Sequence, residues 1–266
     1  MKIPYYQIDV FTNDLFKGNP AGVCILPSGW LSDELMKKIA FENNLSETAF
    51  VTRQEGSFYL RWFTPTAEMD LCGHATVAPA HVFFEEIGFD SRLIKFETRS
   101  GTVRVENKDK FLVLDFPSRP PIKCEEPQGI QDVLGKMPLE VLKARDLMFV
   151  FDEEEDVRNM KPDFRGVLNW GCHGVIVTAP GKDADFVSRF FAPVVGVNED
   201  PVTGSAHSTL IPYWSKRLNK TDLYAKQISA RGGELFCQYM GDRVKIGGKA
   251  ITYLRGEIDV LDQSNK

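Results

Sequence analysis

An internal repeat is the feature that most limits how this chain can fold. Three segments of the first half recur in the same order in the second half, at a spacing of about 130 residues, a normal size for one domain. The matched pairs are residues 61–65 (RWFTP) with 189–193 (RFFAP), 71–76 (LCGHAT) with 200–206 (DPVTGSA), and 98–101 (TRSG) with 230–233 (ARGG). The repeat predicts two similar halves, residues 1–117 and 129–266.

The residues between these halves are rich in proline. Pro117, Pro120, Pro121 and Pro127 fall within eleven residues. Proline fixes φ and cannot donate a backbone hydrogen bond, so such a stretch disfavours helix and strand. Residues 118–128 are therefore predicted to form an irregular crossover.

Composition excludes several classes of protein. A net charge of −5 argues against a nucleic-acid binder, which needs a basic face for the phosphates. No apolar run approaches the ~20 residues that span a membrane, and the N-terminus does not resemble a signal peptide. The five scattered cysteines form no CxxC pair, which favours reduced thiols in a cytoplasmic protein and argues against a structural zinc module.

Local patterns predict mostly antiparallel strands with few helices. Ser32 is a good N-cap, and Asn43 and Asn44 can close the helix that follows it. A second helix is expected over residues 73–84, and another from Gly204. The acidic run at residues 152–156 could bind a cation, but such runs are usually solvated loops or helix starts, and we interpret it so.

Two loops of small residues, at Gly73 and Gly204, each open a predicted helix. Free backbone N–H groups and the helix dipole at such a position favour an anion. The two loops could face each other across a cleft between the halves, or they could be ordinary capped helix starts. Neither is a P-loop, because the GxxxxGK[ST] lysine is missing.

Four side chains near these loops could carry chemistry. Glu47 lies between a predicted helix and an apolar strand, where partial desolvation would raise its pKa toward the range useful for proton transfer, although it could equally be a surface carboxylate. Cys72 could be a nucleophile with a pKa lowered by the helix N-terminus, or a small buried residue. His74 could protonate a substrate, and Asp200 could simply form a turn with Pro201.

Zinc is a further alternative at the first loop. Cys72 and His74 could join Cys172 and His173, but neither pair has the usual ligand spacing. The sequence therefore predicts no metal site.

Four motifs together resemble the PhzF-like (phenazine biosynthesis) family. They are Ser46–Phe50 (SETAF), residues 61–65, residues 70–76 (DLCGHAT) and residues 199–207 (EDPVTGSAH), and the opening GNPA at residues 18–21 agrees. The resemblance implies the diaminopimelate epimerase-like fold. That fold is α/β (α+β), with two pseudo-symmetric domains, each a mostly antiparallel curled sheet around a central helix.

The resemblance also implies a function. Family members are metal-free and cofactor-free isomerases. Those of phenazine pathways act on a dihydro-hydroxyanthranilate, and a glutamate of the enzyme moves a proton between carbons of the substrate ring. That glutamate corresponds to Glu47. The substrate contacts correspond to Gly73, His74, Asp200, Gly204 and Ser205, and a homodimer is expected.

Three hypotheses follow. The first is an isomerase in which Glu47 moves a proton on a small carboxylate-bearing metabolite. The second is an amino-acid epimerase or racemase that depends on Cys72, although the second half has no cysteine at the matching place. The third is a non-catalytic small-molecule-binding protein of the same fold.

Overall fold

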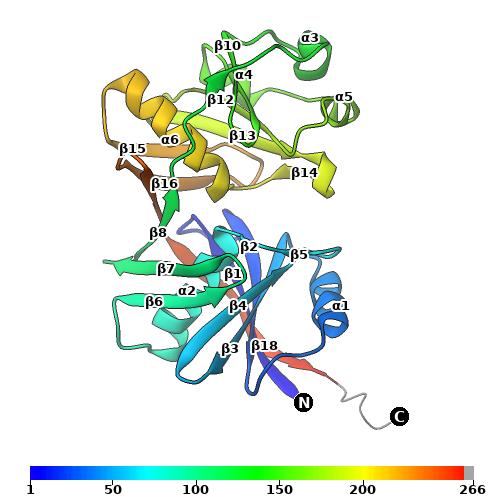
Figure 1. Ribbon diagram of the computed structural model, residues 1–266, viewed down its shortest axis with the longest axis vertical. Coiled ribbons are helices and arrows are strands. Elements are labelled where there is room, and N and C mark those ends of the chain that lie inside the picture. The colour runs from blue at the N-terminus through cyan, green and yellow to red at the C-terminus, as the bar shows by residue number, and fades with distance from the viewer. Residues whose placement is uncertain (261–266) are drawn as a thin grey trace. The chain divides into compact units, whose positions relative to one another are not determined.

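Two compact units divide the chain (Figure 1). The computed structural model describes residues 1–260. The first unit contains residues 1–114 and the C-terminal segment that starts at Gly248, and the second contains residues 115–247. The predicted halves differ from this division mainly in that C-terminal segment. It belongs with the first unit because strand β18 (Ala250–Asp259) pairs with strand β1 (Lys2–Val10).

The first unit is built on one mostly antiparallel sheet. Its strands follow the order β18-β1-β2-β3-β4-β6-β7-β8, in which β2–β3 and β4–β6 are parallel and the other neighbours are antiparallel. The short β5 pairs with the end of β4. The strands after β1 are β2 (Asn19–Leu26), β3 (Glu47–Gln54), β4 (Ser57–Phe63), β5 (Glu68–Met69), β6 (Leu93–Thr98), β7 (Gly101–Lys108) and β8 (Phe111–Pro117).

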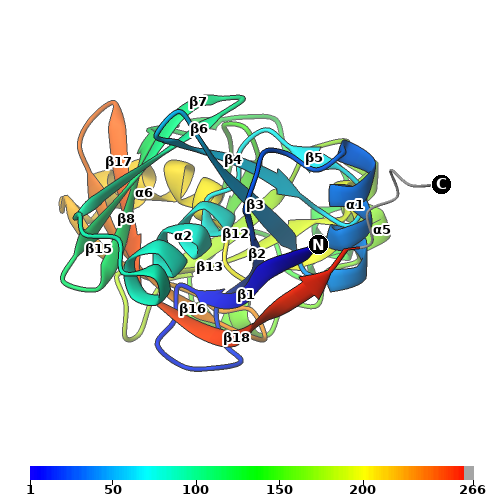
Figure 2. The same ribbon diagram turned by 90° about the horizontal axis from the view of Figure 1, so that it is seen from below.

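Helix α2 (His74–His81) is the centre of the first unit (Figure 2). All of its residues are buried, and it contacts β1, β2, β3, β7 and β18. Pro79 has no N–H to donate to the carbonyl of Ala75, and the Trp62 indole donates to that carbonyl instead, at 3.1 Å. A π-helical segment, η1 (Val82–Ile87), continues α2, so the predicted helix over residues 73–84 is observed in two parts.

Helix α1 (Asp33–Asn43) has the predicted ends. The Ser32 hydroxyl accepts a hydrogen bond from the Leu35 amide at 3.3 Å, and Asn44 closes the helix in the left-handed conformation, with φ of 48°. Strand β3 begins three residues later, at Glu47. The helix end therefore determines where this carboxylate enters the sheet.

The second unit repeats the strand pattern of the first. Its order is β9-β10-β11-β12-β13-β15-β16-β17, in which β11–β12 and β13–β15 are parallel and the other neighbours are antiparallel. The short β14 pairs with β13 as β5 pairs with β4. The strands are β9 (Ile122–Lys123), β10 (Glu140–Lys143), β11 (Leu147–Val150), β12 (Val175–Pro180), β13 (Phe186–Ala192), β14 (Val197–Asp200), β15 (Asp222–Gln227), β16 (Gly233–Tyr239) and β17 (Arg243–Gly248).

Helix α6 (Gly204–Leu218) corresponds to α2 and also contains a proline. Pro212 cannot donate to the carbonyl of Ser208, and the backbone N–H of Arg119 donates to it at 2.9 Å. Arg119 lies in the proline-rich crossover, which is therefore attached to α6. The crossover also contains β9, so the prediction that it lacks regular structure is wrong at Ile122 and Lys123. These two residues lie between the prolines, where backbone groups can still pair.

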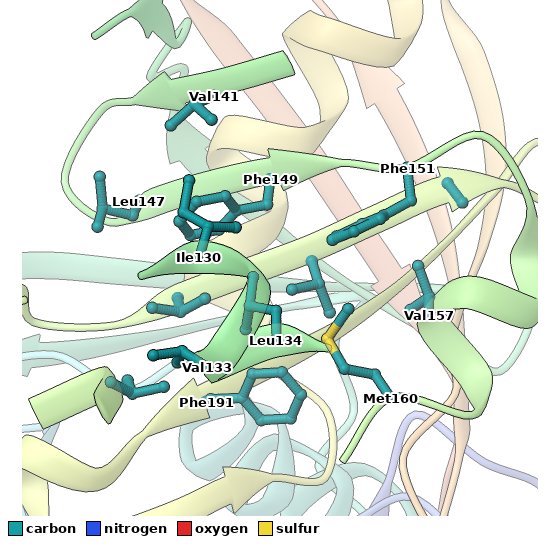
Figure 3. Packing of buried hydrophobic residues seen from close by; sticks show 14 of the residues in the cluster. Ile130, Val133, Leu134, Val141, Leu147, Phe149, Phe151, Val157, Met160 and Phe191 are labelled. Carbon is teal, nitrogen blue, oxygen red and sulfur yellow. The ribbon is translucent and has the colours of Figure 1, made fainter. Parts of the chain in front are cut away.

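The remaining helices of the second unit are short and were largely unpredicted. Their buried residues join one hydrophobic core with those of the sheet, which includes Phe149, Phe151 and Phe191 (Figure 3). These helices are α3 (Ile130–Leu134), α4 (Glu154–Arg158), α5 (Phe164–Asn169) and the 3-10 helix η2 (Pro193–Val195). The acidic run forms the start of α4, where Glu153 and Asp156 make a capping box, and this agrees with its interpretation as a helix start.

One ion pair occurs at matching places in both units. Arg61 on β4 binds Glu68 on β5 through two nitrogens, at 2.7 Å each. Arg189 on β13 binds Glu199 on β14 in the same way, at 2.7 and 2.9 Å. The paired RWFTP and RFFAP segments therefore share a bidentate arginine as well as a strand. Within residues 1–260, no helix is long and apolar enough to cross a membrane.

Candidate active site

Three predicted residues lie together in the first unit. Glu47 is the first residue of β3, Cys72 is in the loop before α2, and His74 is the first residue of α2. One ligand atom from each lies within 4.8 Å of the other two. Glu47 is distant in sequence from the other two residues, and the packing of α2 against β2 and β3 brings it to them.

Glu47 and His74 face each other with little exposure to solvent. Glu47 Oε2 and His74 Nε2 are 3.1 Å apart, and their side chains are 15% and 5% exposed. The two atoms form an ion pair when the ring is protonated, and neither has a hydrogen-bond partner beyond this contact. Most buried polar atoms are fully hydrogen-bonded, so a bound molecule can supply further contacts here.

Two further side chains hold the histidine ring in place. Asn19 Nδ2 is 3.2 Å from His74 Nδ1, and Ser46 Oγ donates to Asn19 Oδ1 at 3.3 Å. The ring therefore presents Nδ1 to Asn19 and Nε2 to the Glu47 carboxylate. Asn19 and Ser46 belong to motifs of the sequence, but neither was assigned a role there. Their position beside His74 requires the β2–β3 pairing.

The electrostatics of this cluster change the interpretation of Cys72. Burial raises the pKa of the Cys72 thiol, and the nearby Glu47 carboxylate raises it further, against the opposing effects of His74 and of the backbone N–H of Ala75. The helix N-terminus alone predicted a lower pKa. That expectation is wrong, because burial and the neighbouring carboxylate outweigh the dipole.

His74 is affected in the opposite sense. Burial acts to lower the pKa of this imidazole, but Cys72 and Glu47 together raise it well above its ordinary value. The ring therefore keeps its proton to a higher pH than an ordinary histidine, with positive charge beside the carboxylate.

The predicted residues of the second unit lie around the start of α6. Asp200 ends β14, and the Thr203 hydroxyl donates to Asp200 Oδ2 at 2.5 Å. Gln227, at the end of β15, accepts from the Thr203 amide at 2.9 Å and donates to the Asp200 carbonyl at 2.8 Å. No sequence pattern pointed to Gln227, whose side chain organises a loop that precedes it by more than twenty residues.

Neither central helix begins with a side-chain cap. Gly73 precedes α2 and Thr203 precedes α6, and neither makes a side-chain hydrogen bond to the first turn. Gly204 is buried and Ser205 is half-buried in that turn of α6. His207, also near it, is fully buried, and its Nδ1 donates to the Thr203 carbonyl at 2.9 Å.

The zinc alternative of the sequence takes its ligands from both units. Cys172 and His173 belong to the second unit, where His173 Nδ1 is 2.9 Å from Asp146 Oδ1. Within residues 1–260, the group of three or more metal-type side chains consists of Glu47, Cys72 and His74.

Comparison with known proteins agrees with this architecture. A family model described as phenazine biosynthesis-like protein, PhzC-PhzF, matches residues 8–256. The chain belongs to this family. An uncharacterised isomerase of Pseudomonas aeruginosa is 50% identical to it over 259 residues, which is 97% of this chain and 99% of the relative.

Solved structures show the same fold. A PhzF-family protein of Enterococcus faecalis is 46% identical, with a TM-score of 0.95 over 98% of this chain and 100% of that one. A predicted epimerase of Pseudomonas aeruginosa, at 19% identity, has a TM-score of 0.75 over 97% of this chain and 100% of that one, a likeness of fold alone. The predicted diaminopimelate epimerase-like fold is confirmed, as is the expectation that this PhzF-family chain is an isomerase.

Proposed function

We propose that this PhzF-family isomerase moves a proton between two carbons of a small carboxylate-bearing substrate, with Glu47 as the acid–base group. The observation that carries the proposal is the pair Glu47 Oε2 and His74 Nε2, which lie 3.1 Å apart, little exposed to solvent, and have no hydrogen-bond partner beyond this contact. Both groups therefore keep hydrogen-bonding capacity for a ligand. A carboxylate in this position can reach a substrate proton once the substrate is bound.

The proposed reaction has two proton transfers and no redox step. Glu47 takes a proton from one carbon, so that a C–H bond breaks, an O–H bond forms, and the electron pair moves into the adjoining unsaturated system. The carboxyl proton exchanges with solvent, and the same carboxyl group then delivers a proton to a second carbon at the other end of that system. His74, held by Asn19 through Nδ1, stabilises the negative charge of the intermediate with its Nε2 proton.

Substrate binding is proposed for Gly73 and His74 in the first unit and for Asp200, Gly204 and Ser205 in the second. The support is that α2 and α6 both begin without a side-chain cap. Their first-turn N–H groups are the kind of donor that binds a carboxylate. Ser205→Ala should raise KM for the substrate with a smaller effect on kcat, and an unchanged KM would contradict this role.

The test of the mechanism is the exchange of substrate hydrogen with solvent. A library of small unsaturated carboxylates in D₂O, followed by NMR, detects deuterium at the carbon that receives the proton. Glu47→Gln keeps the shape of the side chain and removes the base, and it should slow exchange by about 10²–10⁴-fold. Glu42→Gln, an exposed change on α1, is the matched control and should be silent.

The same assay separates the other two hypotheses. An epimerase would incorporate deuterium at one stereocentre, and Cys72→Ser would abolish exchange while Glu47→Gln retained it. The raised pKa of Cys72 speaks against that outcome. A non-catalytic member of the fold would bind carboxylates, as seen by a shift in Tm, without exchange. Either result contradicts the role proposed for Glu47.

The family resemblance adds two expectations to this proposal, a homodimer and a cytoplasmic location. Sedimentation of the purified protein tests the first, and fractionation of cells that express it tests the second. A monomer at micromolar concentration, or recovery outside the cytoplasm, would contradict the corresponding expectation.

A further inference from the structure

The Glu47–Cys72–His74 cluster combines the three side-chain types that bind zinc. A carboxylate oxygen, a thiol sulfur and an imidazole nitrogen lie within 4.8 Å of one another, around the N-terminus of α2. Three protein ligands with one open position is the usual composition of a non-structural zinc site. The sequence alone did not predict this set, because strands β3, β4 and β5 separate Glu47 from the other two residues.

The separation between the carboxylate and the imidazole is close to that of a tetrahedral zinc ion. Zinc bonds of about 2.0 Å to oxygen and 2.0–2.1 Å to nitrogen place those two ligand atoms about 3.3 Å apart. Glu47 Oε2 and His74 Nε2 are 3.1 Å apart. Cys72 Sγ is 3.6 Å from the other ring nitrogen, Nδ1, so the thiol has to turn to reach an ion at Nε2.

The contacts of the ring indicate which nitrogen binds. Nε2 lies 3.1 Å from Glu47 Oε2 and has no other partner, whereas Nδ1 already faces the Asn19 amide and Cys72 Sγ. Coordination at Nε2 leaves Nδ1 to bond Asn19, and a group that orients the second nitrogen is the usual companion of a histidine ligand. The Asn19 amide can turn to accept from Nδ1–H, because the Ser46 hydroxyl beside it can either donate or accept. Rotation of Cys72 about χ1 then brings Sγ to the ion.

Charge also favours a dication at this position. Glu47 and the thiolate form of Cys72 are both anionic, and a divalent cation neutralises the two together. On binding, the thiol and the protonated imidazole each lose a proton to solvent, and a metal–sulfur and a metal–nitrogen bond form. The fourth position is left for water or an anion.

We propose that this cluster is an inhibitory site for a thiophilic divalent cation, with Zn²⁺ bound by Glu47, Cys72 and His74. Binding depends on these three side chains alone. Inhibition also rests on the proposed function, because a metal on Glu47 removes the group assigned as the base.

The experiment titrates the chelator-treated full chain with Co²⁺ and then displaces Co²⁺ with Zn²⁺. We expect one ion per chain, d–d bands of tetrahedral intensity, and a cobalt–thiolate charge-transfer band that Zn²⁺ abolishes. Cys72→Ser should remove the charge-transfer band, and calorimetry with Zn²⁺ should show more than tenfold weaker binding in Cys72→Ser and Glu47→Gln. Cys172→Ser, a half-buried cysteine of the second unit, is the matched control and should bind as the original chain does.

The two proposals fail in different ways. The metal site would be overturned if the original chain showed no cobalt–thiolate band. It would also be overturned if Cys172→Ser lost that band as completely as Cys72→Ser. Circular dichroism of each variant shows that it is folded, and Glu47→Gln gives a second measurement if Cys72→Ser does not fold. Metal binding that leaves deuterium exchange unchanged would keep the metal site and refute Glu47 as the base.

Discussion

His207 makes the second unit sensitive to acid, and the size of the effect follows from its surroundings. The ring is fully buried beside Phe186, its Nδ1 donates to the Thr203 carbonyl, and its Nε2 has no partner. Burial therefore lowers the pKa of His207 from the ordinary value of 6.5 to about 4. A second proton would be placed on Nε2, where nothing in the surrounding structure accepts it.

The sign and the magnitude can both be stated. Below pH 6.5 the unfolded chain binds a proton at His207 that the folded chain does not, so the free energy of unfolding falls as the pH falls toward 4. Each unit of pKa difference corresponds to about 1.4 kcal/mol, which gives a loss of about 3 kcal/mol between pH 7 and pH 4. Above pH 7 the contribution is constant.

Native-state hydrogen exchange of α6 measures this effect locally. The opening free energy of α6 should fall by about 3 kcal/mol more in the original chain than in His207→Gln over the same pH range. Glutamine can still donate to Thr203, so the variant keeps the bond and removes the titration. Equal pH dependence in both chains, or an NMR titration of His207 near pH 6.5, would refute the reasoning.

Three further predictions concern residues that stabilise the fold. Trp62→Phe leaves the Ala75 carbonyl without its donor beside Pro79 and should lower the free energy of urea unfolding by about 1–3 kcal/mol. Gly18→Ala should lower Tm, because φ is +65° and the new Cβ would lie 2.2 Å from the Val10 carbonyl oxygen; an unchanged Tm would contradict this. A lysine at position 189 cannot keep the bidentate ion pair or the bond to the Met160 carbonyl. In urea unfolding, Arg189→Lys should therefore lower the free energy of unfolding more than an arginine-to-lysine change at an exposed position does.

Local sequence was sufficient for several parts of this protein. The helix from Ser32 to Asn44 is bounded by residues whose own side chains and backbone end it, so its limits could be predicted. The repeat predicted two similar halves, and the same strand order in both units agrees with it. The placement of Glu47 at the start of an apolar strand was predictable for the same reason, since a helix end and a strand start are local signals.

Other features depend on contacts between distant segments. Strand β18 joins the first unit through pairing with β1, at the opposite end of the chain, and no local pattern reports such a partner. The same is true of Gln227, which organises the loop before α6 from another strand.

The candidate site shows the same division. Residue type and local neighbours already mark Glu47, Cys72 and His74 as reactive groups. How these groups affect one another depends on the fold. Packing of α2 inside the sheet buries Cys72 and His74 beside Glu47. Burial and the carboxylate raise the pKa of Cys72, whereas Cys72 and Glu47 raise that of His74 against the effect of burial. Burial and proximity are properties of the folded chain, because they depend on segments that meet only when the sheet closes around the helix.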